Sequence, residues 1–407
     1  MRRTNPGSGP QPAASVVWTQ DYLGYQLSAD HPLDPVRLDL TMRLARCVGV
    51  LDGVETLTPD AAPDAELLRI HTRGYLAAVK GAPSQLQSVG HGLGSEDNPI
   101  FARMHEASAL LTGGSLAAAR EIASGRTRRA VTIGGGLHHA MADAASGFCV
   151  YNDAAVAISW LLDHGFDRVA YVDVDVHHGD GVQAAFAHDP RVLTVSVHQH
   201  PATLWPGTGW CHEVGTGSAA GTSVNLPLLP ATSDAAWLRA FHAVVPSVVR
   251  AFRPQLLVTQ CGVDTHREDP LADLRLTVDG HRAVFVALRA LAEETAEGRW
   301  LVLGGGGYGL VRVVPRSWTH LLATVLDRDV APDTAIPGRW SEHAAQRWPS
   351  VPLPSTMGEG GDTAYEPWGG GVGEAASPAA AKVDPAIRDT RQAVFPLLGL
   401  DPDDPRD

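Results

Sequence analysis

Cysteine and long hydrophobic runs are both scarce in this sequence. The four cysteines, Cys47, Cys149, Cys211 and Cys261, form no CxxC pair and are too scattered to predict a disulfide framework. The N-terminal residues lack the apolar core of a signal peptide, and no apolar run approaches the roughly 20 residues that a membrane helix needs. We therefore expect a cytoplasmic protein that has no membrane partner.

Basic side chains are outnumbered by acidic ones. The 407 residues include 32 Lys and Arg against 45 Asp and Glu, which gives a formal net charge of −13. An acidic surface argues against generic nucleic-acid binding and would help to attract cationic substrates. Hydrophobic residues make up 44% of the chain and charged residues 19%, so a largely disordered chain, a coiled coil and a collagen-like chain are excluded.

The middle of the chain alternates short apolar runs with longer helical patterns. The predicted strands are 130–134, 168–176, 192–198, 255–262 and 299–305, and the predicted helices are 101–124, 152–165, 233–252 and 278–298. Near-continuous apolar runs suit strands that are buried on both faces of a parallel sheet. We therefore predict one α/β domain over 15–328, preceded by a disordered tail at 1–14. Residues 329–407 form a Gly- and Pro-rich C-terminal extension, whose segment 389–400 we expect to dock on the domain.

Candidate metal ligands lie at the ends of two of the predicted strands. In YVDVDVHHGDGVQ (171–183), Asp173, Asp175 and His177 alternate, so a strand would place them on one face. Carboxylate and imidazole groups together make a metal-ligand set, whereas an edge strand with solvated side chains would not explain the HGDG that follows. Asp264 lies just past the run at 255–262. Alone it would more often be a turn or helix-cap residue, but a third ligand beside Asp175 and His177 would leave the open position that a catalytic metal requires.

A histidine pair is the first candidate for acid–base chemistry. His138 and His139 follow three glycines in TIGGGLHHAMADAASGFCVYND (132–153). Neutral histidine is the usual general base near neutral pH, and a carboxylate partner fixes its tautomer. Asp173 and Asp180 are available for that purpose, although a lone histidine pair is usually a surface feature.

A second glycine-rich segment carries a tyrosine. In LVLGGGGYGL (301–310), four consecutive glycines exclude a helix interior. The segment lacks the GK[ST] of a phosphate-binding P-loop and the glycine spacing of a dinucleotide fold. Tyr308 is then the informative residue, because a phenol beside a metal can donate a hydrogen bond to a developing oxyanion.

Taken together and in this order, these segments resemble the zinc-dependent histone deacetylase superfamily. The resemblance extends from HPLDPVRLDLTMRLA (31–45) to VPRSW (314–318), and it includes GSEDNP (94–99) and VSVHQHPATLWPGTG (195–209). The segments THREDPL and AVFPLLGLDP are most similar to bacterial acetoin-utilisation (AcuC-type) deacetylases. The resemblance implies the arginase/deacetylase-like three-layer α/β/α sandwich with a central, mostly parallel sheet.

The resemblance also implies catalytic and metal-binding roles. The residues that match zinc ligands are Asp175, His177 and Asp264. The residues that match catalytic groups are His139 backed by Asp180 (the base that activates water), His138 backed by Asp173 (the second histidine, which helps to protonate the leaving amine) and Tyr308 (the phenol that polarises the acyl carbonyl). Zinc is the expected metal, with ferrous iron as the in vivo alternative.

Further roles implied by the resemblance concern the substrate and a second ion. The residues that match the substrate-binding set are Asp97 at the rim, Phe148 and Trp205 as tunnel walls, and the glycines Gly147 and Gly306. Arg37 matches the arginine of an internal channel. A structural potassium ion would be held by Asp173, Ser196 and the backbone of residues 175, 177 and 197. Two departures are Cys261-Gly262-Val263 before the third ligand and Gly309 after the tyrosine, where the family more often has other residues.

The resemblance implies hydrolysis of N6-acetyl-lysine in proteins to lysine and acetate. The expected partners are acylated lysine side chains, with an acyl-CoA synthetase as one candidate protein, while the oligomeric state stays open. An acetylpolyamine amidohydrolase is the main alternative. A binuclear-manganese ureohydrolase would need an Asp where the sequence has His266, and a non-catalytic acyl-lysine binder would have lost a ligand, a base or Tyr308.

Overall fold

A parallel sheet forms the centre of the molecule. The computed structural model describes residues 14–85, 90–370 and 377–407, and within these ranges eight strands pair in the order β2-β1-β3-β8-β7-β4-β5-β6, every pair of neighbours being parallel. The strands are β1 (Ala14–Val17), β2 (Thr56–Leu57), β3 (Arg129–Thr132), β4 (Val169–Asp173), β5 (Val192–Gln199), β6 (Ser223–Leu228), β7 (Leu256–Gln260) and β8 (Trp300–Leu303). The predicted α/β fold is therefore confirmed, and β1, β2 and β6 are strands that the sequence patterns did not predict.

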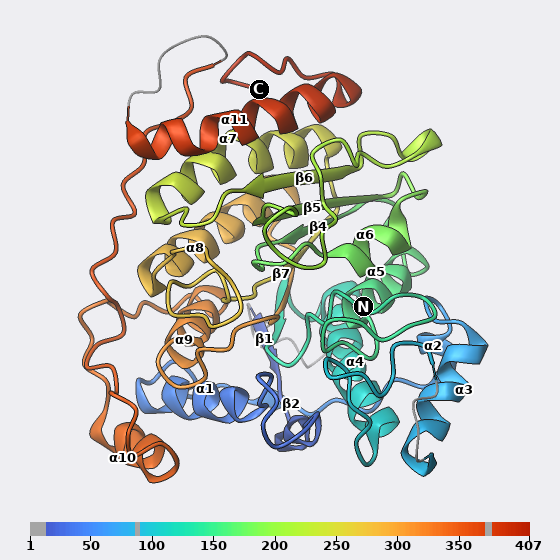
Figure 1. Cartoon of the computed structure of the whole chain (residues 1–407), viewed down its shortest axis with the longest axis vertical. Helices are drawn as coiled ribbons and strands as arrows, with labels where there is room; N and C mark the ends of the chain where they lie inside the picture. Colours follow the sequence, from blue (N-terminus) through green and yellow to red (C-terminus); the bar gives the residue numbers. More distant parts are fainter. Residues whose placement is uncertain (1–13, 86–89, 371–376) are drawn as a thin grey trace, which may run out of the picture.

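Helices cover both faces of the sheet, which makes three layers (Figure 1). One layer contains α4 (Met104–Ala123), α5 (Asp153–Leu162) and α6 (Asp180–Phe186), and the other contains α1 (Val36–Cys47), α7 (Asp234–Phe252), α8 (Val278–Thr295) and α9 (Val314–Val325). The remaining helices are α2 (Asp64–Leu67), α3 (Arg73–Gly81), α10 (Gly338–Arg347) and α11 (Pro378–Val394), with 3-10 turns η1 (Gln20–Gly24), η2 (Ala82–Ser84), η3 (Gly217–Ala219) and η4 (Phe395–Leu398). No described helix is both long and apolar enough to cross a membrane.

The central strands are buried along their whole length. Every residue of β3, β4, β5, β6, β7 and β8 is buried, as expected for a sheet with helices on both faces. Because all strands are parallel, their carboxyl ends meet at one edge of the sheet, where α/β proteins place their functional groups. The loops after β3, β4, β7 and β8 carry the polar segments singled out above.

The turn after β4 corrects one detail of the sequence prediction. The strand ends at Asp173, so Asp175 and His177 lie in a bend and not on a strand face. The carboxylate of Asp173 accepts the amide N–H of Asp175 at 3.1 Å, and that of Asp175 accepts the amide N–H of His177 at 3.0 Å. Such side-chain bonds to the backbone two residues ahead compete with strand pairing and turn the chain off the sheet.

The first described residue belongs to the sheet, and the chain after α9 forms the C-terminal extension. Residues 1–13 of the expected tail fall outside the described residues, and Ala14, the last residue of that tail, begins β1. After α9 the chain forms α10, then runs without regular secondary structure along the outer side of α9 and α8, and ends in α11 against α7 and β6 (Figure 1). A buried ion pair of Arg239 with Asp384, at 2.8 Å, ties α11 to α7.

Candidate active site

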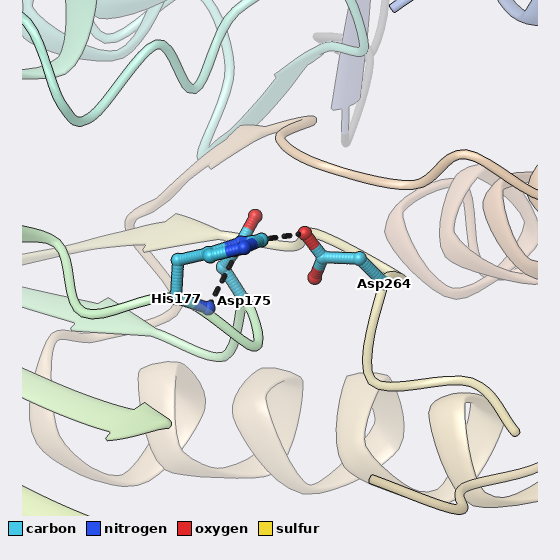
Figure 2. Close-up of side chains that lie close together, drawn as sticks. All are labelled: Asp175, His177 and Asp264. Atoms are coloured by element: carbon cyan, nitrogen blue, oxygen red, sulfur yellow. Dashed lines mark hydrogen bonds and ion pairs between the residues drawn. The ribbon is translucent and has the colours of Figure 1, made fainter. Parts of the chain in front are cut away.

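Two carboxylates and an imidazole converge at the carboxyl edge of the sheet. Asp175 and His177 come from the turn after β4, and Asp264 comes from the loop after β7. Within the described residues they form a group whose ligand atoms all lie within 4.8 Å of one another, and all three are buried. Figure 2 shows the His177 ring directed toward the carboxylate of Asp264 with Asp175 beside it; its Nδ1 lies 3.1 Å from Asp175 Oδ1 and 3.2 Å from Asp264 Oδ2.

Each carboxylate is oriented by hydrogen bonds from neighbouring groups. Asp175 Oδ2 accepts from the side chain of Gln260 and from the amide of Gly306, both at 2.7 Å. Asp264 Oδ1 accepts from the amide of Val176 at 2.8 Å. The other oxygens, Asp175 Oδ1 and Asp264 Oδ2, are thereby turned toward His177. Gln260 was not foreseen as a site residue, although it lies in the predicted strand 255–262.

The donor set fits a divalent metal ion. Burial and the negative charge of Asp175 raise the pKa of Asp264 above its usual range, because two buried carboxylates share one site. A cation bound between them would offset that repulsion. Two carboxylate oxygens and one imidazole nitrogen are ligands that zinc and ferrous iron both accept, and three protein ligands leave a position open.

Two histidines lie beside this cluster, each paired with its own carboxylate. His138 Nδ1 lies 2.7 Å from Asp173 Oδ2, and His139 Nδ1 lies 2.7 Å from Asp180 Oδ1. Both histidines are buried, and their ring centroids are 3.9 Å apart. The His139 ring is 5.7 Å from that of His177, so the pair adjoins the candidate ligands.

The two histidines differ in charge because their surroundings differ. Burial alone would lower the pKa of His138, but the nearby charges of Asp173 and Asp175 outweigh it and raise that pKa to about 9. Burial and the positive charge of His138 lower the pKa of His139 to about 4, despite its bond to Asp180. At neutral pH His138 is therefore protonated and the adjacent His139 is neutral. Such a separation of pKa values is typical of acid–base pairs.

Tyr308 approaches the cluster from the glycine-rich loop after β8. Burial, followed by the charges of Asp264 and Asp175, raises the pKa of its phenol well above the usual range, so the hydroxyl keeps its proton. Its amide donates to Asp269 at 2.8 Å, and the preceding carbonyl of Gly307 accepts from Arg37 at 2.9 Å. The sequence motifs did not single out Asp269 as a site residue, although the THREDPL segment contains it.

A cavity of about 180 Å³ leads from the surface to the cluster. Its walls include the predicted substrate-binding residues Asp97, Gly147, Phe148 and Trp205, together with His139, His177, Tyr308, Leu204 and Leu271. Gly306 lies deeper, in a small hollow that also contains His138 and Asp175. The two leucines are apolar lining that the sequence patterns did not mark.

The mouth of the cavity combines an aromatic wall and an exposed carboxylate. Phe148 meets Tyr308 edge-to-face with ring centroids 5.7 Å apart, while Trp205 is 44% exposed and meets His139 edge-to-face. Asp97 is exposed at the rim. Helix α4 begins at Met104 with Arg103 as its N-cap, so Asp97 does not cap that helix.

Ser196, expected near a structural cation, lies opposite Asp173 in the register of β4 and β5. Its hydroxyl is hydrogen-bonded with His198 Nδ1 at 2.8 Å. Asp173 also accepts from Tyr171 at 2.6 Å, so this carboxylate contacts the phenol and His138 at once.

Comparison with known proteins identifies the family. A family model described as "Histone deacetylase domain" matches residues 31–325. The "Acetoin utilization protein AcuC" of Bacillus subtilis (strain 168) is 38% identical over 351 residues, which cover 85% of this chain and 90% of that protein. This chain belongs to the histone deacetylase family. The relationship predicted from the sequence motifs, including the similarity to AcuC-type members, is confirmed.

Other relatives agree with this assignment to the histone deacetylase family. The AcuC protein of Staphylococcus xylosus is 36% identical over 337 residues, covering 82% of this chain and 87% of its own length. A solved structure described as an HDAC homolog complexed with SAHA superimposes with a TM-score of 0.79 at 28% identity, covering 92% of this chain and 99% of that chain. Family membership supports a deacetylase, and hence a hydrolase, with a buried candidate metal site.

Proposed function

We propose that this family member is a zinc-dependent lysine deacetylase that hydrolyses N6-acetyl-lysine in proteins to lysine and acetate. The observation that carries the proposal is the cavity lined by Phe148 and Trp205, which reaches His177 of the buried group formed with Asp175 and Asp264. A narrow aromatic entrance suits a flexible four-carbon lysine stem, because the methylenes are buried while the acyl group reaches the cluster.

The metal is held by Asp175, His177 and Asp264 in this proposal. When bound, zinc or ferrous iron would act as a Lewis acid, which polarises the acyl carbonyl and strengthens water as a nucleophile. The remaining chemistry belongs to side chains of the chain itself. A structural potassium ion at Asp173 and Ser196 is a further part of the proposal, supported by their adjacent positions in β4 and β5.

The neutral histidine acts as the base. Asp180 occupies Nδ1 of His139, so Nε2 is left to take a proton from the attacking water. As the water oxygen adds to the acyl carbon, the Tyr308 hydroxyl donates a hydrogen bond to the oxyanion that develops on the carbonyl oxygen. The C–N bond then breaks, the leaving amine takes a proton from the histidine pair, and acetate is the coproduct. Protonated His138, backed by Asp173, stabilises the negative charge of these steps.

The rim and tunnel residues hold the substrate. Asp97 accepts hydrogen bonds from the backbone of the acylated peptide, and Gly147, Phe148 and Trp205 enclose the lysine stem. Gly306 leaves room beside the carboxylates for the acyl end. Acylated lysines of an acyl-CoA synthetase are one candidate substrate, and the cytoplasm is the proposed location, which the four free cysteines support.

An acetylpolyamine amidohydrolase is the second candidate, since its substrate presents the same acyl–amine group to the same cluster. A ureohydrolase is disfavoured, because His266 contacts Glu359 at 3.0 Å and is not among the candidate metal ligands. The test is a panel of acetyl-, propionyl-, butyryl- and crotonyl-lysine peptides assayed against acetylpolyamines, together with elemental analysis. Faster turnover of the acetyl-lysine peptide and one divalent ion per chain are expected. Preference for acetylpolyamines would replace the proposed substrate, and two manganese ions per chain would overturn the mechanism.

A further inference from the structure

A segment of the C-terminal extension packs against α8, α9 and the loop after β7. This segment, residues 356–361, is held by a backbone hydrogen bond from the Met357 amide to the Thr334 carbonyl at 2.9 Å and by Arg316, whose guanidinium donates to the carbonyl of Gly358 at 3.2 Å. The amides of Glu359 and Gly361 both donate to one carboxylate oxygen of Asp279, in the first turn of α8, at 2.8 and 2.9 Å.

At Gly361 the segment packs so closely that no side chain would fit. A Cβ added at Gly361 would lie 2.0 Å from the hydroxyl of Thr277 and 2.6 Å from a carboxylate oxygen of Asp234. Met357 is fully buried. The segment is therefore packed as an internal part of the domain, although it follows the last strand of the sheet by more than 50 residues.

Glu359 directs its carboxylate toward the loop that carries a candidate metal ligand. The side chain of Glu359 is 7% exposed and contacts His266 Nε2 at 3.0 Å and Arg267 at 3.2 Å, and it forms a short ion pair with Arg316. Burial would raise the pKa of Glu359, but the hydrogen bond from His266 and the ion pair with Arg316 lower it to about 2, so it is ionised at neutral pH. His266 is fully buried and lies two residues after Asp264.

The other ring nitrogen of His266 shows which group donates the hydrogen bond between His266 and Glu359. His266 Nδ1 accepts the amide N–H of Glu268 at 3.0 Å, so the ring N–H that faces Glu359 is on Nε2. His266 therefore donates to Glu359. The ring is fixed at both ends, one end by its own loop and the other by the C-terminal extension, 93 residues further along the chain.

The loop 264–271 unites several parts of the site. It begins with Asp264 and ends with Leu271, which lines the tunnel. Between them, Asp269 accepts the amide of Tyr308 at 2.8 Å and that of Leu271 at 3.0 Å. A shift of this loop would therefore move a metal ligand, a tunnel wall and the support of the tyrosine together.

We propose that Glu359 is a positioning residue of the active site, which acts through His266 to hold the loop 264–271 in place. The C-terminal extension is then part of the catalytic apparatus and not a separate attachment. This inference rests on the deacetylase function proposed above. Groups that orient ligand-bearing elements typically change metal affinity or activity by about 10–100-fold when removed, and a contact one step behind the ligand belongs at the lower end of that range.

The test compares two buried ion pairs that tie the same extension to the domain. Glu359→Gln removes the charge behind the site, and the control Asp384→Asn removes the charge that pairs with Arg239 between α11 and α7. Both variants should lose thermal stability. Only Glu359→Gln should also weaken Zn²⁺ binding to the metal-free protein, measured by competition with a chelating dye, and lower kcat on an acetyl-lysine peptide about tenfold with little change in KM.

A third variant tests whether His266 carries the effect. His266→Asn keeps an acceptor for the Glu268 amide but cannot reach Glu359, and it leaves the pair of Glu359 with Arg316 in place. It should reproduce the loss of Zn²⁺ affinity and kcat, and the double variant should be no worse than the more affected single variant. If Glu359→Gln does not fold, His266→Asn is the deciding variant. Wild-type Zn²⁺ affinity and wild-type kcat in His266→Asn would then overturn the inference.

Failure of this inference is distinguishable from failure of the proposed function. If wild-type protein neither binds Zn²⁺ nor hydrolyses the peptide, the deacetylase proposal itself fails. If wild-type protein does both and Glu359→Gln behaves like Asp384→Asn, Glu359 only stabilises the fold, and the inference is wrong.

Discussion

Gly306 offers a sharp test of how the carboxylates are arranged. A Cβ at this position would lie 2.0 Å from Asp264 Oδ2 and 2.7 Å from Asp175 Oδ2, against the 3.0 Å below which real Cβ contacts are essentially never seen. The backbone of Gly306 cannot retreat, since its amide donates to Asp175 at 2.7 Å and its carbonyl accepts from Val263 at 2.9 Å. Asp264 is also held, by the amide of Val176.

In Gly306→Ala, the Asp264 carboxylate must therefore move by about 1 Å. A displacement of about 1 Å in a catalytic constellation can cost about 100-fold in rate. We expect kcat/KM on an acetyl-lysine peptide to fall by about that factor, and Zn²⁺ affinity to fall with it. The assays are initial rates, chelator competition and thermal unfolding.

The matched control for this substitution is Gly338→Ala. Gly338 is the first residue of α10, and nothing lies within 4 Å of a Cβ built there, so activity and Zn²⁺ binding should be unchanged. A folded Gly306→Ala protein with wild-type Zn²⁺ affinity and turnover would refute the argument that these two carboxylates form the metal site.

Three further predictions follow from the same geometry. Tyr308→Phe keeps the ring but removes the donor, so kcat should fall about 10²–10³-fold while a hydroxamate inhibitor still binds; near-normal kcat would contradict the oxyanion role. Asp97→Ala should raise KM for peptides more than for small acyl-lysine amides, and an equal effect on both would argue against a backbone clamp. The pKa of Glu359 is lowered from 4.5 to about 2, so the stability that it adds is fully present above its unfolded pKa and is lost as the pH falls through that interval. The difference in Tm between wild type and Glu359→Gln should therefore be largest near neutral pH and shrink toward pH 2, and a difference that grows in acid would be inconsistent with this ionisation.

Local pattern was sufficient for the fold class and the five central strands. Their apolar runs are nearly continuous because both faces of the sheet are covered, and that signal is independent of partners. Two of the three strands that were not predicted gave weaker signals. β2 has two residues, and β6 contains Asn225 and Pro227, so neither resembles a buried strand until it is paired with its neighbour.

The chemistry of the site was also visible in sequence, as residue types in motifs. Asp175, His177 and Asp264 could be named from their positions after two apolar runs, because parallel strands bring their carboxyl ends together. The backbone conformation around these residues could not be predicted from the sequence. The bend that ends β4 at Asp173 depends on side-chain bonds to the backbone that a strand pattern does not reveal.

What the tertiary structure alone decided is which distant groups support these residues. Gln260 orients Asp175, Asp269 holds the amide of Tyr308, and Glu359 contacts His266 across 93 residues. From sequence alone, a glutamate in a Gly-rich segment is expected to be a solvated linker residue. Only the packing of Glu359 against α8 and α9 brings it next to the site. Residue types and local periodicity thus determined the fold class and the candidate ligands of this deacetylase family member. The orientation of those ligands comes from long-range contacts, whose partners are chosen by the packing of the whole chain.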